Sequence, residues 1–338
     1  MIAAILTRPG IIEIREIETP EPSEGELLIE IKASLTCGTD LKAFIRGHSL
    51  IPMPGPFGHE FSGEVAAKGK GVSKFKVGDA VMAVHSAPCM NCSYCRRSLF
   101  NLCENLMSTK ILGAFSEYIL LPKHIVRQNT FKKPGGLSFK EASFLEPLSC
   151  VVHGMEPLNI NKKDTVFIIG AGPIGLLHLM YAKSKGAKVL ITGIEEERLK
   201  MAEKLGADHV FNNSHSERSV RDFTGGVGVD YVFECTGQPD IWESSVNYVR
   251  RGGTVILFGG CRSGTIVHFD AERLHYDEIT LKGTFHFTPQ DVKKAYLLLK
   301  NKKIDVKKLI SGTYPLKEIE NVFARLVKGE GIKYAIVP

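Results

Sequence analysis

The stretch from Val166 to Arg198 constrains the fold more strongly than any other part of the sequence. It holds an apolar run, a glycine-rich turn, an apolar segment with helical periodicity, and a second apolar run that begins at Lys188. This order predicts a strand–helix–strand unit with two parallel strands. Short apolar strands separated by helical segments continue after it, so we expect a parallel sheet with both faces covered by helices.

The glycines of this unit favour a dinucleotide site. Gly170 suits the sharp turn, Gly172 lets the backbone approach a pyrophosphate, and Gly175 lets helix and strand pack closely. The helix that begins at Pro173 and Ile174 offers free amides and the positive end of its dipole to the phosphates. A glycine-rich turn without a ligand is the alternative, but strands are predicted on both sides of the turn.

Length, charge and hydropathy exclude several classes of protein. A chain of 338 residues exceeds one ordinary core and indicates two domains. The net charge of +6 is spread along the chain with acids between the bases, so we expect no nucleic-acid partner. No apolar run is long enough to span a bilayer, and no basic leader precedes the first apolar segment. We therefore expect a cytoplasmic protein without a membrane partner.

The remaining patterns separate a β-rich first part from an α/β middle and a helical tail. Ser138, with Glu141 three residues later, predicts a capping box at the start of a helix. The strand–helix alternation begins at Thr165. Two helical patterns, 289–302 and 316–328, then precede a last strand.

Four of the eight cysteines cluster in the lobe 86–106. Short spacings let their thiolates converge on one ion, and four thiolates leave no coordination position open. We therefore expect a structural zinc site, with an iron–sulfur centre as the main alternative. The expected ligands are Cys89, Cys92, Cys95 and Cys103.

A second metal site is indicated by Cys37, His59 and the neighbouring Glu60. A thiolate, an imidazole and a carboxylate can hold zinc with the fourth position open, as catalysis requires. A single cysteine or histidine is more often a packed core residue. The surrounding segments, 37–40 with the sequence Cys-Gly-Thr-Asp and 58–60 with Gly-His-Glu, make the metal site the stronger interpretation.

With these motifs the sequence resembles the zinc-dependent medium-chain dehydrogenases and reductases of the alcohol dehydrogenase superfamily, in particular the sorbitol (polyol) and L-threonine dehydrogenase branch. The resemblance runs from end to end and also rests on the segments 146–149, 170–175 and 230–237. It implies an α/β fold. A GroES-like, β-rich catalytic domain would comprise residues 1–147 and 286–338, and a Rossmann domain with a doubly wound parallel sheet would be inserted at 148–285.

The resemblance also implies roles for single residues. Glu60 would be a carboxylate that can exchange with water on the metal, Thr39 would accept the proton of the substrate alcohol, and Asp40 would orient His59. Hydride would pass to a nicotinamide cofactor, and each chain would hold one catalytic and one structural zinc. The implied ligands of the catalytic zinc are Cys37, His59 and Glu146.

Two departures from the family pattern concern the proton relay and the cofactor. Lys42 stands where relatives often continue the relay with a histidine, and its role stays open. Gly193 ends the second Rossmann strand, where NAD-specific relatives carry an acid. Glu195 is close enough in sequence to bind the ribose diol, and Arg198 is a candidate for the adenine or a 2′-phosphate. The acids at 195–197 would repel that phosphate, so we expect NAD, with NADP as the alternative. Further expected cofactor contacts are Thr236 and Gly237.

A third departure concerns the substrate. Sorbitol dehydrogenases carry an Arg-Tyr pair where this chain has His286 and Phe287, which makes sorbitol itself doubtful. We expect these two residues and His48 to line the substrate pocket. The expected substrate is a small polyol, sugar alcohol or related secondary alcohol, and L-threonine 3-dehydrogenase is the nearest alternative.

A zinc-free reductase, or a cofactor-binding protein without turnover, is the competing class of protein. The resemblance implies a homo-tetramer or homo-dimer paired through the Rossmann sheet edge near 254–264. We expect the other chemically reactive side chains to be buried core residues. These are Cys150, His178, Cys235 and Cys261.

Overall fold

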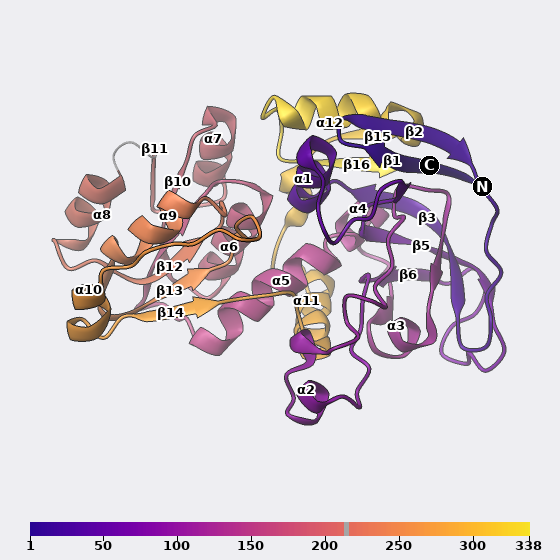
Figure 1. Ribbon diagram of the computed structural model, residues 1–338, viewed down its shortest axis with the longest axis horizontal. Coiled ribbons are helices and arrows are strands. Elements are labelled where there is room, and N and C mark those ends of the chain that lie inside the picture. The colour runs from indigo at the N-terminus through magenta and orange to yellow at the C-terminus, as the bar shows by residue number, and fades with distance from the viewer. Residues whose placement is uncertain (213–215) are drawn as a thin grey trace. The chain divides into compact units, whose positions relative to one another are not determined.

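A computed structural model describes residues 1–212 and 216–338 (Figure 1). The chain forms two compact units, Met1–Cys150 with Phe287–Pro338, and Val151–His286. The sequence had placed these boundaries at 147 and 286. The first unit is rich in β-strands and the second contains a parallel sheet, so the expected α/β fold class is confirmed. Within the described residues no helix is both long and apolar enough to cross a bilayer.

The first unit contains a seven-stranded sheet in which strands from the two ends of the chain are neighbours. Its order is β15-β16-β3-β5-β6-β8, and β7 also pairs with β3. Apolar side chains alternate along β3 and pack in one core with Phe61 and Val65 of β5. The strands are β3 (Leu27–Leu35), β5 (Glu60–Lys68), β6 (Ala80–Ala83), β7 (Tyr118–Leu121), β8 (Thr130–Lys132), β15 (Ile310–Pro315) and β16 (Lys333–Val337).

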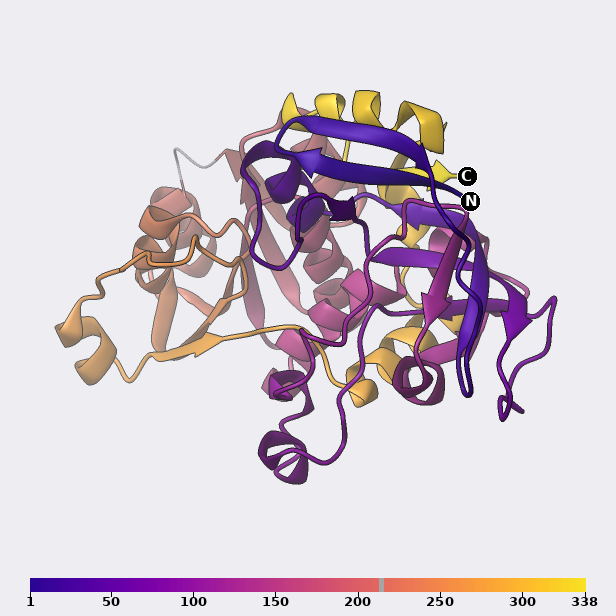
Figure 2. The same ribbon diagram turned by 45° about the vertical axis from the view of Figure 1, so that its right-hand side comes forward.

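A small second sheet, β2-β1-β4, lies beside the C-terminal helix α12 (Figure 2). Phe44, Phe57 and Phe323 join the helices and this sheet in a second apolar core. Helix α4 begins at the predicted capping box of Ser138 and Glu141, which is confirmed. These elements are β1 (Ile2–Arg8), β2 (Ile11–Glu16), β4 (Gly55–Pro56), α1 (Gly38–Arg46), α2 (Ser93–Arg96), α3 (Lys123–Gln128), α4 (Phe139–Ala142), α11 (Pro289–Lys300) and α12 (Ile319–Val327), while α5 (Leu145–Met155) runs across the boundary between the units.

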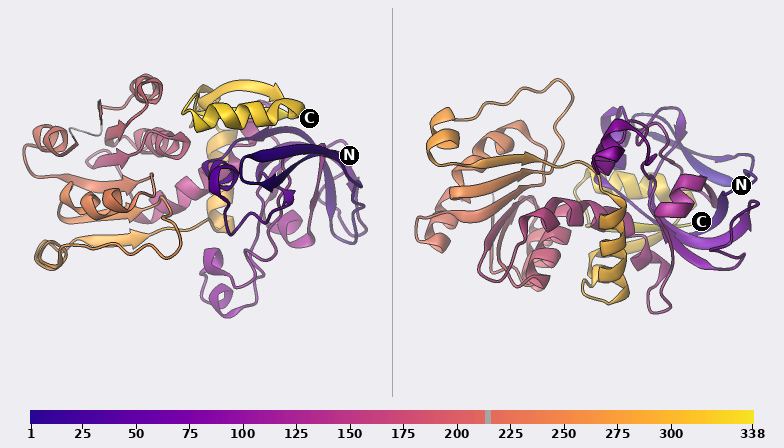
Figure 3. Two further views of the ribbon diagram at one scale, coloured as in Figure 1. Left: turned by 45° about the horizontal axis from the view of Figure 1, so that its top comes forward. Right: turned by 90° about the horizontal axis from the view of Figure 1, so that it is seen from below.

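The second unit is a six-stranded parallel sheet with helices on both faces (Figure 3). Its order is β11-β10-β9-β12-β13-β14, so β10 and β12 lie on opposite sides of β9. The chain thus reverses its direction of winding at β9, which is where this fold binds ligands. The elements are β9 (Thr165–Ile169), β10 (Lys188–Gly193), β11 (His209–Asn212), β12 (Val229–Glu234), β13 (Val249–Leu257), β14 (Thr280–Gly283), α6 (Pro173–Ser184), α7 (Glu196–Lys204), α8 (Ser216–Thr224), α9 (Pro239–Ser244) and α10 (Ala271–Tyr276).

Two expectations need correction, one for the edge of this sheet and one for three cysteines. The sheet edge is not near 254–264, because β13 is paired on both sides and β14 forms the edge. Cys150, Cys235 and Cys261 are half-buried rather than fully buried. In these cases the neighbours in space, which local sequence does not specify, decide the outcome.

His178 is a core residue, as predicted. It is fully buried in α6, and its ring lies 4.7 Å from those of Phe233 and Phe258. Neither ring nitrogen has a hydrogen-bond partner among the described residues. Burial lowers the pKa of His178 to about 3, so the imidazole is neutral in the folded protein at neutral pH.

The substitution His178→Leu tests this burial. The unfolded chain takes up a proton near the ordinary pKa of 6.5, whereas the folded chain does so only near 3. The unfolded state therefore binds more protons between these values, and His178 lowers the stability of the protein as the pH falls. Between about pH 7 and about pH 5 we expect the variant to lose about 2 kcal/mol less stability than the wild type.

Urea unfolding followed by the fluorescence of Trp242, the single tryptophan of the chain, measures this difference in the second unit. His268→Leu is the control, because the side chain of His268 is 87% exposed. Equal pH slopes for the wild type and His178→Leu would contradict the assignment.

Candidate functional site

The structure brings Cys37, His59 and Glu60 together, as the sequence predicted. One ligand atom from each lies within 4.8 Å of those of the other two. The register of β3 and β5 explains this, because Leu35 pairs with Glu60. Cys37 follows the end of β3 and His59 precedes β5, so the two side chains meet at the same end of the sheet.

Asp40 lies behind His59 and is fully buried. Its Oδ1 is 3.2 Å from Nδ1 of His59, so the carboxylate faces this ring nitrogen rather than Nε2. Burial alone would lower the pKa of His59, but Asp40 and Cys37 outweigh it and raise the pKa well above its usual value. The surroundings of His59 therefore favour a positive charge, as expected where a cation binds.

Glu60 forms a buried ion pair with Lys333, a residue that the sequence analysis missed. The ammonium group of Lys333 donates to Oε2 of Glu60 and to the carbonyl oxygen of Thr36, the latter over 2.5 Å. Burial raises the pKa of Glu60 although Lys333 opposes this shift. The other carboxylate oxygen, Oε1, is buried and has no hydrogen-bond partner among the described residues. An unpartnered buried oxygen beside a thiol and an imidazole fits a metal site.

Glu146 lies next to this cluster but outside it. Its Oε1 is 3.6 Å from Nδ1 of His85 and 3.7 Å from Sγ of Cys150, one helical turn further along α5. Burial raises the pKa of Glu146 to about 7, and the charges of His59 and Glu60 also act on it. His85 was not predicted from the sequence, because a single histidine before the cysteine lobe has no motif around it.

Four other residues were predicted for this region, namely Thr39, His48, His286 and Phe287. Thr39 is half-buried in the first turn of α1. His48 is half-buried, and its Nδ1 accepts a hydrogen bond from the backbone of Leu50. Phe287 is buried with its ring 6.0 Å from that of His85, whereas His286, with φ of 62°, is the last residue of the second unit. Phe287 therefore packs beside the residues around Glu146.

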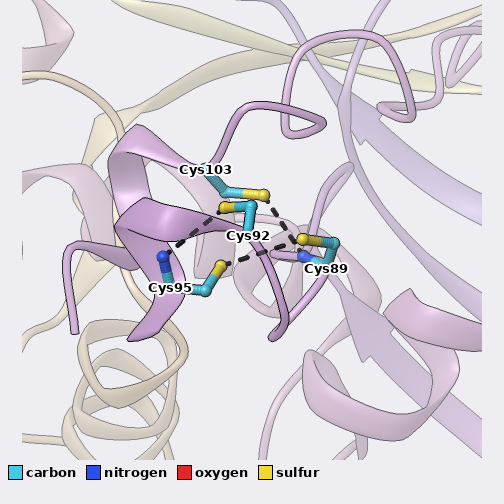
Figure 4. A group of neighbouring side chains, drawn as sticks. All are labelled: Cys89, Cys92, Cys95 and Cys103. Carbon is cyan, nitrogen blue, oxygen red and sulfur yellow. Dashed lines mark hydrogen bonds between the residues drawn. The ribbon is translucent and has the colours of Figure 1, made fainter. Parts of the chain in front are cut away.

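The four clustered cysteines converge as predicted (Figure 4). All four sulfur atoms lie within 4.8 Å of one another, and none of the cysteines forms a disulfide. Backbone amides donate to Sγ of Cys92 and Cys103, over 3.5 and 3.3 Å. Hydrogen bonds from the backbone lower the pKa of Cys89 to about 6, and burial raises that of Cys95 to about 12. Four converging sulfurs without disulfides fit a closed thiolate site for one metal ion.

The glycine turn after β9 has the geometry of a phosphate cradle. A Cβ at Gly170 would lie 2.9 Å from Thr236, and a Cβ at Gly175 only 1.8 Å from the carbonyl oxygen of Gly170. A Cβ at Gly172 would meet no described atom within 4 Å. Gly170 and Gly175 are therefore fixed by close packing, while the space beside Gly172 and the start of α6 is open to a ligand.

Steric packing explains the missing acid at Gly193. A Cβ at this position would lie 2.8 Å from that of Ala171, so no larger side chain fits. The next charged residue is Glu195, which precedes α7, and its carboxylate contacts Arg198 over 3.0 Å. Both predicted cofactor residues thus lie together just beyond the carboxyl end of β10.

Comparison with protein families agrees with both the metal-site unit and the unit that carries the glycine turn. Residues 23–131 match the model of the alcohol dehydrogenase GroES-like domain, and residues 173–301 match that of zinc-binding dehydrogenases. The chain is 33% identical to the sorbitol dehydrogenase of Halalkalibacterium halodurans over 348 residues, which covers 100% of this chain and 99% of the relative.

Two further proteins resemble the chain over most of their length. The D-arabitol-phosphate dehydrogenase of Enterococcus avium is 33% identical, and the match covers 95% of this chain and 92% of that protein. A zinc-binding dehydrogenase of Sinorhizobium meliloti, solved with bound NADP, has a TM-score of 0.90 at 29% identity and covers 100% of this chain and 99% of that one.

A double-mutant cycle tests the buried pair of Glu60 and Lys333. We expect Lys333→Met to lower the free energy of unfolding by about 3–5 kcal/mol, because it leaves a buried carboxylate without its cation. Adding Glu60→Gln should restore a large part of this loss, because the double variant buries no net charge. Thermal unfolding followed by circular dichroism measures the four proteins. Strictly additive losses would show that the two residues act independently.

Proposed function

The chain belongs to the zinc-dependent medium-chain dehydrogenases of the alcohol dehydrogenase superfamily, and on this basis we propose that it interconverts a polyol or related secondary alcohol and the corresponding ketone with zinc and a nicotinamide cofactor. The observation that carries this proposal is the group formed by Cys37, His59 and Glu60, with ligand atoms within 4.8 Å of one another. A thiol, an imidazole and a carboxylate are ligands that zinc prefers, and three such ligands leave a fourth coordination position open.

We propose that Cys37, His59 and Glu146 hold the catalytic zinc and that Glu60 exchanges with water beside it. A bound zinc would supply a Lewis acid for the alcohol oxygen. Asp40 keeps His59 in the tautomer that presents Nε2, since its carboxylate faces Nδ1. Thr39 is proposed to accept the proton of the substrate hydroxyl and to pass it on through Lys42 or through water.

We propose NAD as the cofactor and NADP as the alternative. Glu195 lies where a carboxylate can accept hydrogen bonds from the ribose diol, and its contact with Arg198 engages the guanidinium that a 2′-phosphate would need. The adjacent acids Glu196 and Glu197 add repulsion. NADP in the Sinorhizobium meliloti relative supports the alternative.

The names of the relatives support polyols and their phosphates as the substrate class. One relative acts on sorbitol and another on D-arabitol phosphate. His286 and Phe287 replace the Arg-Tyr pair of sorbitol dehydrogenases, so the preferred polyol is proposed to differ from sorbitol. L-threonine would require partners for an ammonium and a carboxylate, which the predicted pocket residues do not supply.

We further propose a second, structural zinc on the four clustered cysteines and a cytoplasmic location, where these metal-binding thiols stay reduced.

The chain is proposed to form a homo-dimer or homo-tetramer through β14, whose edge is unpaired among the described residues. Sedimentation as a monomer would contradict this assembly.

Initial rates with NAD and NADP on a panel of polyols, polyol phosphates, L-threonine and simple secondary alcohols test the function. We expect turnover with one polyol class, a preference for NAD of about tenfold or more, and loss of activity on chelation. Metal analysis should give two zinc ions per chain. Turnover of L-threonine alone would replace the proposed substrate, and turnover unaffected by removal of zinc would contradict the proposed chemistry.

Matched cysteine variants separate the two zinc sites. Cys37→Ser should lose one zinc ion and nearly all activity because it removes a proposed catalytic ligand. Cys150→Ser should keep both ions, because Cys150 contacts Glu146 but lies outside the group of ligand atoms.

A further inference from the structure

Glu234, at the end of β12, is a fully buried carboxylate that organises the turn after its own strand. It accepts a hydrogen bond from the backbone N–H of Thr236 over 2.7 Å and from that of Gly237 over 3.1 Å. The hydroxyl group of Thr236 donates to it as well. The side chain of Glu234 therefore fixes both the backbone of this turn and the direction of the Thr236 hydroxyl group.

The backbone of Glu234 holds the neighbouring turn, after β13. Its carbonyl oxygen accepts from the N–H groups of Phe258 and Gly259, over 3.0 and 2.8 Å. The indole N–H of Trp242, in α9, donates to the carbonyl oxygen of Gly259 over 2.8 Å. One residue thus ties together the turns that follow two adjacent parallel strands.

The two turns touch each other so closely that only glycine fits. A Cβ at Gly237 would lie 2.5 Å from the carbonyl oxygen of Gly260, and a Cβ at Gly259 would lie 2.3 Å from the backbone nitrogen of Gly237.

The carboxylate of Glu234 has no ion-pair partner among the described residues, and burial raises its pKa. Burying a carboxylate without a cation costs stability, which indicates a role beyond closing a turn.

The position of these turns connects them with the cofactor. Thr236 lies next to Gly170, the first glycine of the cradle, across the junction of β9 and β12. In this fold a dinucleotide crosses that junction with its pyrophosphate at the start of α6. Glu195 and Arg198 follow β10, on one side of β9, so the nicotinamide half must extend along the ends of β12 and β13.

We propose that Glu234 is a positioning residue for the nicotinamide half of the cofactor: it locks the turns after β12 and β13 into one rigid wall beside the nicotinamide ring. This inference rests on the proposed function, since it requires that the chain binds a nicotinamide dinucleotide. Glu234 acts through Thr236, Gly237 and Gly259 and does not itself touch the ring. A wall that is already ordered costs the cofactor no ordering entropy on binding.

Trp242 is the only tryptophan of the chain and is hydrogen-bonded to this wall, so its fluorescence is the probe that we choose for cofactor binding. We expect Glu234→Gln to raise the dissociation constant of NADH about tenfold. The side-chain NH₂ group of the glutamine would face backbone N–H groups that now donate hydrogen bonds to the carboxylate, and two donors cannot pair. The dissociation constant of ADP-ribose, which lacks the nicotinamide, should change less than about twofold. If the wild type prefers NADPH, that cofactor and its 2′-phosphorylated fragment are the probes.

Two further variants separate positioning from stability. Asp230→Asn removes the carboxylate at the opposite end of β12, which accepts from the N–H of Thr165 and pairs with Arg250. It should lower the unfolding temperature but leave the affinity for NADH unchanged. Glu234→Asp keeps the charge but is too short to reach both turn amides, and it should weaken NADH binding even if the glutamine variant does not fold.

The outcomes distinguish this inference from the proposed function. Glu234 variants that bind NADH as tightly as the wild type, or that lose NADH and ADP-ribose equally, would overturn the positioning role while the proposed function stands. A wild-type protein that binds neither NADH nor NADPH would overturn the proposed function, and the positioning role with it.

Discussion

The buried ion pair of Glu60 and Lys333 joins the first and the last parts of the chain at the candidate metal site. Glu60 begins β5 and Lys333 begins β16, and these strands lie on opposite sides of β3. Neither charge is stable alone in the apolar interior of the unit. The carboxylate beside Cys37 and His59 therefore depends on the pairing of β16 with β3, which brings Lys333 to it.

The same cluster shows why its residues suit a cation. Four groups that can carry negative charge surround the imidazole of His59, namely Cys37, Asp40, Glu60 and Glu146. Burial opposes charge on the glutamates, and their carboxyl groups resist ionisation until a positive group balances them. The cysteine lobe also gathers groups that can carry negative charge. Its four sulfurs would fill every coordination position of one ion, so no position is left for a substrate.

In the second unit, close packing rather than charge determines which residues are possible. Ala171 leaves no space for a side chain at Gly193, so the acid expected at the end of β10 is absent and Glu195 is the nearest alternative. The turns after β12 and β13 exclude any side chain at Gly237 and Gly259. These close contacts allow only glycine at three positions of the cofactor region. Glu234 accepts the hydrogen bonds that hold the turn after β12 in place.

Features that depend on short-range spacing were predictable from the amino-acid sequence. The glycine turn at 170–175, the capping box at Ser138 and the convergence of the four cysteines each depend on residues within a short segment of at most fifteen residues, and all were predicted. The proximity of Cys37 and His59 was predictable only because each residue lies in a short recognisable motif. The alternation of strands and helices likewise indicated the α/β class before any contact was known.

Contacts between residues far apart in the chain depend on the three-dimensional fold. Lys333 beside Glu60, His85 beside Glu146 and β14 at the sheet edge follow from strand order and register, and no local pattern marks them. The physical reason is that a buried charge or an exposed edge is defined by its neighbours in space. Periodicity specifies which face of a strand is apolar, but the pairing of the strands specifies what that face touches.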